Sequence, residues 1–172
     1  MPISTIGSDA LASSSVTRPK IGYAGAVLQV VSATKTNTAS TTSTTPVDTG
    51  LELTITPVSS TSKILLMTTV MASQSAIKRI YFRFAGGNSS VAVGDANTGH
   101  EATFSINSRS GDSYIMLPGC ASYFDSPATT SAITYKIQWW VESDTGYLNR
   151  PATIDANGAN TVSTITAMEI SA

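Results

Sequence analysis

The chain is short of charge and of long apolar runs. Asp, Glu, Lys and Arg make up 12% of its 172 residues, about half of the roughly 25% found in ordinary soluble domains. The net charge is −1, and without a basic stripe to follow a phosphate backbone, no nucleic-acid partner is expected. Runs such as KILLMTTVMA fall far short of the ~20 residues that a membrane helix needs. We therefore expect no membrane insertion.

Residues for catalysis and metal binding are also scarce. The one cysteine, Cys120, excludes an intrachain disulfide, and its flank LPGCASYF indicates a small buried hydrophobe. The one histidine, His100, lies in NTGHEATF, and no Gly-x-Ser-x-Gly elbow surrounds any serine. DANTGHE begins like a calcium loop, but Gly99, His100 and Ile106 stand where that loop needs Asp or Asn, Gly and Glu. No metal, cofactor or catalytic site is predicted.

Acidic residues leave one enzymatic alternative open. The two carboxylates of a glycoside hydrolase can be distant in sequence, so spacing does not test for a small depolymerase. Asp112, Asp144 and Asp155 lie in SGD, SDTG and DANG, where turn formation accounts for them without catalysis. The chain is therefore predicted not to be an enzyme.

The N-terminal segment differs in composition from the rest. Residues 1–24 are small, polar and rich in Ser and Ala, with four isolated apolar residues: Ile3, Ile6, Leu11 and Val16. No positive region precedes an apolar core, so no secretory signal peptide is predicted. The chain is expected to work where it is made, or to leave by a route other than secretion. Residues 1–24 are predicted to be an extended attachment arm, and residues 25–172 one domain.

Hydroxyl groups and short strand-like runs are abundant. Ser and Thr together number 50, about 29% of the chain. They take the place of the charged residues, which are about half as frequent here as in an ordinary soluble domain. Helical periodicity is nearly absent, whereas apolar residues repeat with period 2. In GLELTITP the predicted core face is Leu51, Leu53 and Ile55; in AITYKIQWWVES it is Ile133, Tyr135, Ile137, Trp139 and Val141. About nine or ten such segments between turn signals predict an all-β, antiparallel sandwich or barrel.

Four local features follow from the same pattern. The first strand should continue through VVSATKTNTAS to about Thr38, with TTSTTPVDT as the loop to the next strand. Gly86-Gly87-Asn88 should turn KRIYFRF back into SSVAVGDA as a hairpin. SYIMLPG and ASYFDSP are predicted as separate strands, and the alternation of NTVSTITAMEIS as slipping near its end.

The pair Trp139-Trp140 places one ring on each face of a strand. Three interpretations of the outward ring stay open: packing on the second face within one chain, contact with another subunit, or stacking on a ligand such as a carbohydrate. Trp140 and Tyr147 are the predicted residues of an oligomer interface or a glycan contact. The turn Asn88–Ser90 is a further glycan candidate.

Several blocks of the chain are similar to one known group. They are GAVLQVVSATKTNT, TPVSSTSKILLM, VGDA, YFDSPATTSAITYKIQW, SDTGYLNR and NTVSTITAMEIS. Together, over residues 22–172, they resemble the C-terminal β-sandwich module of tail-fibre-like or virion structural proteins of tailed, especially marine, bacteriophages. MPISTIGSDAL also resembles the start of such proteins.

This resemblance implies a jelly-roll-like β-sandwich of about 8–10 strands, present as a homotrimer on the exterior of a phage particle that is assembled in the host cytoplasm. Its partners would be further copies of itself and other virion proteins of the capsid or tail, with residues 1–24 as the tether. The chain has no shaft, coiled coil or repeats, which favours a capsid decoration protein or a short fibre knob. The alternative is a receptor- or glycan-binding tail-fibre tip for host adsorption.

Overall fold

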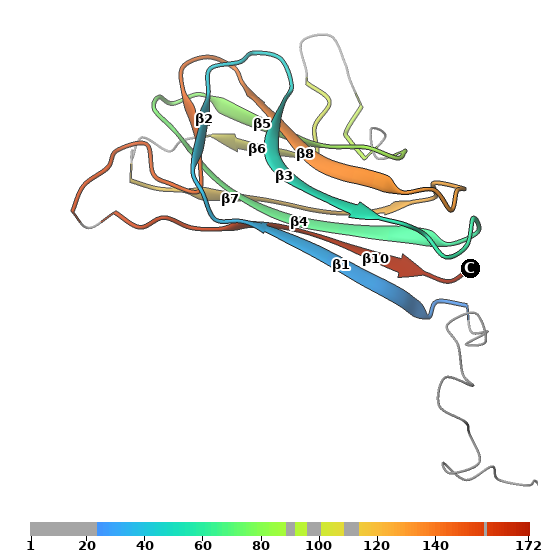
Figure 1. The fold of residues 1–172 in the computed structure, drawn as a ribbon. Coiled ribbons are helices and arrows are strands. Elements are labelled where there is room, and N and C mark those ends of the chain that lie inside the picture. Colours follow the sequence, from blue (N-terminus) through green and yellow to red (C-terminus); the bar gives the residue numbers. More distant parts are fainter. Residues whose placement is uncertain (1–23, 89–91, 96–100, 109–113, 157) are drawn as a thin grey trace, which may run out of the picture.

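The computed structural model describes residues 24–88, 92–95, 101–108, 114–156 and 158–172 (Figure 1). Within these ranges the chain forms ten strands: β1 (Val27–Lys35), β2 (Ala39–Thr41), β3 (Val47–Ile55), β4 (Lys63–Gln74), β5 (Arg79–Ala85), β6 (Ser105–Ser108), β7 (Leu117–Asp125), β8 (Ile133–Val141), β9 (Gly146–Leu148) and β10 (Ser163–Ile170). No helix in the described part is long and apolar enough to span a bilayer. The four apolar residues of the predicted arm and His100 lie outside the described residues.

The strands form two antiparallel sheets that face each other, which confirms the predicted all-β sandwich. Sheet A has the order β1-β10-β4-β9-β2, with β7 paired to the opposite edge of β4. Sheet B has the order β3-β8-β5-β6. In Figure 1 sheet B lies above sheet A, and β2 rises from the lower layer toward the upper one. Sheet A therefore curls around one end of the core.

The core lies between the sheets and follows the period-2 alternation of the sequence. Apolar side chains of β3, β5 and β8 point inward from sheet B, and those of β4 and β10 meet them from sheet A. Burying each of these side chains contributes about 1.5–3 kcal/mol. The predicted inward faces of β3 and of β8 from Tyr135 onward are confirmed. The largest fully buried members are Trp139, Tyr135, Phe82, Phe84, Leu51, Ile55, Ile64, Leu66, Ile80, Ile137, Leu148 and Ile165.

The Thr-rich stretch contains a strand that the pattern did not predict. β1 ends at Lys35, short of Thr38, and β2 then pairs with β9 before β3 begins at Val47. The first strand stops early because the Asn149 side chain donates to the carbonyls of Lys35 and Asn37, at 2.8 and 3.1 Å. These bonds satisfy the backbone where the ladder with β10 ends. The interpretation of TTSTTPVDT as one loop is therefore wrong at both of its ends.

Two other predicted boundaries are also wrong. SYIMLPG and ASYFDSP share the single strand β7, because Pro118 lies near the start of an edge strand, where its missing N–H breaks no ladder. The hairpin partner predicted for β5 carries no strand over residues 92–95. Instead β6 pairs with β5. Just before β6, the Phe104 N–H and the Thr103 hydroxyl both donate hydrogen bonds to the Phe82 carbonyl.

The last strand keeps its alternation without the predicted slip. Ser163, Ile165, Ala167 and Glu169 all point inward, so Ile170 faces out. Glu169 is fully buried and accepts hydrogen bonds from the backbone N–H groups of Val58 and Ser59 and from the Gln29 amide. Burial raises the pKa of Glu169, but these hydrogen bonds to the charged form outweigh it, and its pKa lies below the ordinary value.

Candidate functional site

Trp140 belongs to the outer face of sheet B and yet is only 2% exposed. Its ring stacks on Tyr81, with ring centroids 5.3 Å apart, and the guanidinium carbon of Arg83 lies 5.8 Å from the Trp140 ring centroid. The ring therefore packs on the second face within one chain, and it offers no open surface for a sugar or a subunit. Of the three interpretations of this ring, the contacts with Tyr81 and Arg83 on β5 agree with the first, packing within one chain.

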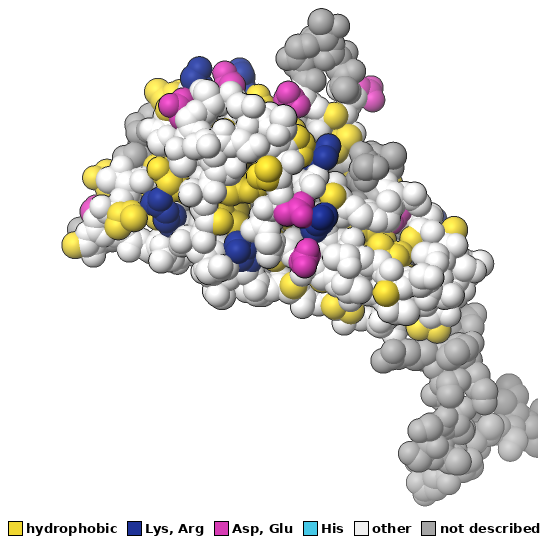
Figure 2. All heavy atoms as spheres, turned by 45° about the horizontal axis from the view of Figure 1, so that its top comes forward, with side chains coloured by type: hydrophobic (Ala, Val, Ile, Leu, Met, Phe, Trp, Pro, Cys, Tyr) yellow, Lys and Arg dark blue, Asp and Glu magenta, His cyan; other side chains and the backbone are white. Residues whose placement is uncertain are grey.

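The rest of this outer face is charged. Lys136 Nζ lies 2.6 Å from Asp48, and Gln138 links Asp48 to the Arg83 guanidinium. Hydrogen bonds from Lys136 and Gln138 lower the pKa of Asp48, and the bond to Asp48 raises the pKa of Lys136. Figure 2 turns this side forward and shows side chains of both signs next to each other. The outer side of sheet B is thus suited to water.

The outer side of sheet A has a different character. Four neighbouring strands, β1, β10, β4 and β7, form this side. Among the outward-facing side chains of their described residues, Lys63 is the one that carries a charge. The other side chains are apolar or carry hydroxyls. We call the apolar part the sheet A face; it consists of Val27, Val30, Leu65, Met67, Phe124, Met168 and Ile170.

Cross-strand registers arrange this face in rows. One row crosses all four strands as Val30, Met168, Leu65 and Phe124, and its two end residues are each 54% exposed. The rows on the side of this row away from Val27 are rich in hydroxyl groups. In one of them, the hydroxyls of Ser32 and Thr166 form a hydrogen bond of 3.0 Å. Cys120 lies in one of these rows and is exposed, 3.7 Å from the Thr69 hydroxyl. Its predicted burial is wrong because even-numbered residues of β7 face outward.

The described chain begins beside the apolar end of the sheet A face. The Gly25 N–H donates to the Ser171 carbonyl and the Ser171 N–H to the Ala26 carbonyl, both at 2.9 Å. Figure 1 shows the start of β1 next to the end of β10. Residue 24 therefore enters the domain within reach of Val27 and Ile170.

At the other end of the sandwich, Tyr147 lies beneath an arginine. Tyr147 belongs to the short strand β9 and is half-buried, and the guanidinium carbon of Arg150 lies 3.8 Å from its ring centroid. The Tyr147 ring thus supports Arg150, a residue that the sequence reasoning missed. The available signal was YLNR, where one arginine follows an aromatic residue just after a turn in a chain with little charge.

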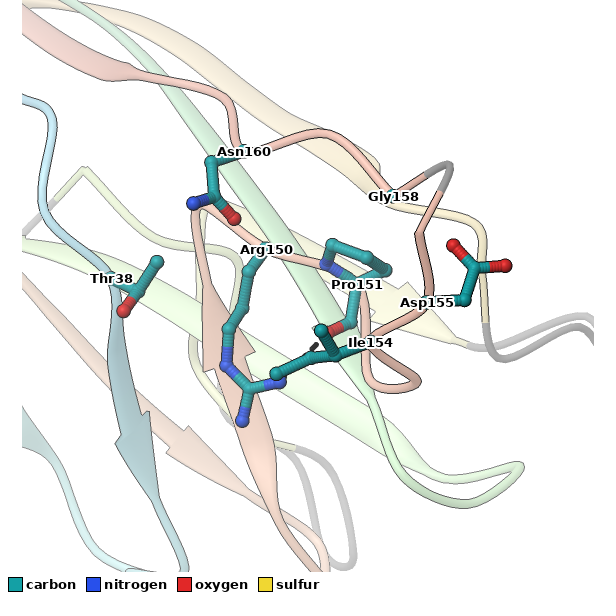
Figure 3. A pocket seen from close by; sticks show the side chains of 7 residues that line it. All are labelled: Thr38, Arg150, Pro151, Ile154, Asp155, Gly158 and Asn160. Atoms are coloured by element: carbon teal, nitrogen blue, oxygen red, sulfur yellow. Dashed lines mark hydrogen bonds between the residues drawn. The ribbon is translucent and has the colours of Figure 1, made fainter.

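Arg150 lines a cavity of about 350 Å³ together with Thr38, Pro151, Ile154, Asp155, Gly158 and Asn160 (Figure 3). A second hollow of about 330 Å³ shares Pro151, Asp155 and Gly158 and adds Tyr114, Met116 and Ala159. Both volumes lie at the lower end of the range of ~300–1,000 Å³ that small-molecule sites occupy. We call the two together the loop pocket, because most of its residues come from the segment between β9 and β10.

Asn149 fixes the base of this segment. It is fully buried with a φ of 59°, a backbone conformation that is uncommon outside glycine. Its side-chain NH₂ group donates to the carbonyls of Lys35 and Asn37, as described above. Its Oδ1 accepts a hydrogen bond from the Ser163 hydroxyl at 2.6 Å. Its backbone N–H donates to Met71 and its carbonyl accepts the Thr161 N–H, both at 2.9 Å. Both ends of the loop are therefore tied to one residue, as in a compact Ω-loop.

The third predicted glycan candidate, the turn Asn88–Ser90, is described only at Asn88. The Asn88 N–H donates to buried Asp125, which also accepts a hydrogen bond from the Tyr135 hydroxyl at 2.6 Å. Burial raises the pKa of Tyr135, and the Asp125 carboxylate adds to this effect. The pair lies in the interior and fastens the end of β7 to β8. Among the described residues no group of three or more His, Cys, Asp or Glu is placed to hold a metal ion.

Comparison with known proteins assigns no family to this chain. No family model matches it, and no curated protein matches it either.

Proposed function

We propose that the protein is a non-enzymatic structural protein of a bacteriophage virion. It is a capsid decoration protein or a short fibre knob on the particle exterior, it associates with further copies of itself, and residues 1–24 attach it. The phage setting and the homotrimer rest on the sequence resemblance. The observation that carries the assembly role is the contrast between the two outer faces of the sandwich.

That contrast favours a covered sheet A face. The outer side of sheet B carries Asp48, Glu52, Arg79, Arg83 and Lys136, whereas the outer side of sheet A carries Lys63 at its edge. Exposed apolar rows without charge mark protein–protein contacts, because water solvates them poorly. A protein that worked alone would gain solubility from charge on both faces.

The size of the face fits association with another copy. Four strands about 4.8 Å apart and five outward positions about 6.8 Å apart give roughly 600 Å² for the whole outer side of sheet A, hydroxyl-rich rows included. Stable interfaces bury about 800 Å² per partner, so the sheet A face with its rim is of the right order. Two such faces would stack as sheets do in a sandwich, about 10 Å apart. Such face-to-face stacking is a two-fold contact; in the homotrimer that the resemblance implies, the sheet A face would instead meet a different surface of the neighbouring copy.

Charge substitution on the sheet A face tests the assembly role. Phe124→Lys would place a charge in the apolar row and remove about 1.5–3 kcal/mol of burial per copy, so the full chain should change from oligomer to monomer in analytical ultracentrifugation. Ile77→Lys is the matched control, since Ile77 is exposed in the turn between β4 and β5, and it should leave the oligomer intact. A monomeric wild-type chain, or a Phe124→Lys oligomer as stable as the wild type, would contradict the proposal.

Deletion of residues 1–24 tests the attachment role separately. The shortened chain should fold and still associate, because β1 begins at Val27, but it should fail to join particles assembled without the protein. Normal incorporation of the shortened chain would exclude the arm as the tether. Quantitative mass spectrometry of purified particles then separates the two positions, since a capsid decoration protein is present in far more copies than a fibre knob.

A further inference from the structure

We propose that the loop pocket binds a carboxylate-bearing saccharide, with the Arg150 guanidinium holding the sugar carboxylate. This inference does not depend on the virion assignment, since it concerns the end of the sandwich opposite to the start of β1. Figure 1 shows the loop between β9 and β10 at one end of sheet A and the start of β1 at the other. A chain attached through its N-terminal segment would present the loop pocket away from the attachment.

The first step is the preparation of Arg150 for an anion. Its guanidinium carbon lies 3.8 Å from the Tyr147 ring centroid, and its Nη1 donates to the Pro151 carbonyl at 3.0 Å, the one hydrogen bond that the group makes among the described residues. The ring contact and the hydrogen bond both restrict the guanidinium, so less side-chain entropy remains to be lost on binding. The planar edge of Nε and Nη2 matches two carboxylate oxygens.

The second step is the polar lining around the guanidinium. In Figure 3, Thr38 lies on one side of Arg150 and Ile154 on the other, with Asn160 above, while the Asp155 carboxylate is turned away from Arg150. Hydroxyl, amide and carboxylate groups together bind the several hydroxyls of a sugar. Asp155 is the one carboxylate in the described lining, and because like charges repel, the ligand carboxylate is expected on the Arg150 side of the pocket, from which Asp155 is turned away.

The third step is the apolar surface. Ile154 is 74% exposed, and with Pro151 it gives the pocket a wall suited to the C–H face of a pyranose ring. The adjoining hollow adds Tyr114, which is 53% exposed. Because aromatic rings combine an apolar body with a polar tip, Tyr114 suits a second sugar unit. The two hollows share three residues, so the geometry fits a short acidic oligosaccharide better than a single sugar.

The experiment compares one saccharide in two charge states. Trigalacturonate and its fully methyl-esterified form have the same rings and hydroxyls and differ in the carboxylate charge. Binding to the full-length ¹⁵N-labelled protein is followed by amide chemical shifts. Trigalacturonate should shift residues around Arg150 and Asn160, and the ester should bind at least about tenfold more weakly, the size of effect expected from losing a charge-assisted pair.

Two arginine variants and one control locate the site. Arg150→Lys keeps the charge but loses the fork, and Arg150→Gln loses both, so affinity should fall in that order, by about tenfold or more for Gln. Arg83→Lys changes an arginine on sheet B, remote from the pocket in sequence and strand order, and should leave binding unchanged. Amide spectra report whether each variant is folded.

Defined results overturn the proposal. They are equal binding of trigalacturonate and its ester, shifts confined to other parts of the sandwich, or an unchanged affinity in folded Arg150→Gln. Alginate oligomers and N-acetylneuraminic acid extend the test to other sugar acids, and failure of all three probes at millimolar concentration also rejects it. Sodium acetate at the same concentration distinguishes a saccharide site, which acetate occupies poorly, from a general anion site, which acetate and trigalacturonate would occupy alike.

Discussion

Replacement of Asn149 by alanine tests whether one buried side chain holds the loop pocket in place. The change removes two bonds to the carbonyls of Lys35 and Asn37 and one from the Ser163 hydroxyl. A hydrogen bond contributes about 0.5–1.5 kcal/mol, and more where a buried partner is left unsatisfied, so three bonds give about 2–4 kcal/mol. Alanine would also have to keep a φ of 59°, which costs about 1 kcal/mol relative to a residue that tolerates it.

Asn149→Gly separates the two contributions. Glycine loses the same side-chain bonds but accepts the backbone conformation, so it should destabilise the protein by about 1 kcal/mol less than alanine does. Urea unfolding followed by tryptophan fluorescence measures both, because Trp139 and Trp140 are buried. Asn160→Ala, in the same loop but exposed, is the control and should change stability by less than about 0.5 kcal/mol.

Two results would refute this reasoning. If Asn149→Ala lowers the free energy of unfolding by less than about 1 kcal/mol, the three buried bonds do not act as described. If the Gly and Ala variants are equally stable, the positive φ at this residue carries no strain. Limited proteolysis adds a local measure, since loss of Asn149 should expose the segment between β9 and β10 to cleavage before the strands unfold.

Two further predictions concern the acid in the core and the glycine turn. Because the pKa of Glu169 is lowered, its ionised form stabilises the fold above the unfolded pKa of about 4.3, and this contribution is lost as pH falls through the folded value. Glu169→Gln should therefore cost about 1–3 kcal/mol at neutral pH and flatten the acid limb of the stability profile; an unchanged acid limb would contradict this. Gly86→Ala would place a Cβ 2.0 Å from the Thr134 carbonyl oxygen and should destabilise far more than Gly25→Ala, which has positive φ but open space. Equal melting temperatures of the two variants would exclude the clash.

The inward faces of the strands could be predicted because they depend on the alternation of apolar and polar residues within each strand. Leu51, Leu53 and Ile55 alternate with polar residues, and a period of 2 places them on one face whatever the strand pairs with. The same holds for β8, where Tyr135, Ile137 and Trp139 point inward. The sandwich follows because such half-buried strands need a second sheet to cover them.

Pairing partners and buried polar groups could not be predicted in this way. The three-residue strands β2 and β9 form because they pair with each other and because β9 pairs with β4. The alternation of residues within so short a segment does not predict these pairings. Trp140 is buried by Tyr81 from a strand about 60 residues earlier, and strand partners are set by topology rather than by spacing. Asn149 and Arg150 look like ordinary loop residues until the fold brings β1 and Tyr147 to them.

The near absence of charge on the sheet A face determines how salt and temperature would act on association through it. Added salt weakens contacts between exposed charges, because the Debye length falls from about 10 Å at 0.1 M to about 3 Å at 1 M. Contacts between apolar and hydroxyl groups are not screened, and salts such as sulfate strengthen them, whereas cooling weakens the apolar contribution. Association through Val30, Leu65, Phe124 and Met168 would therefore persist at high salt concentration and weaken at low temperature.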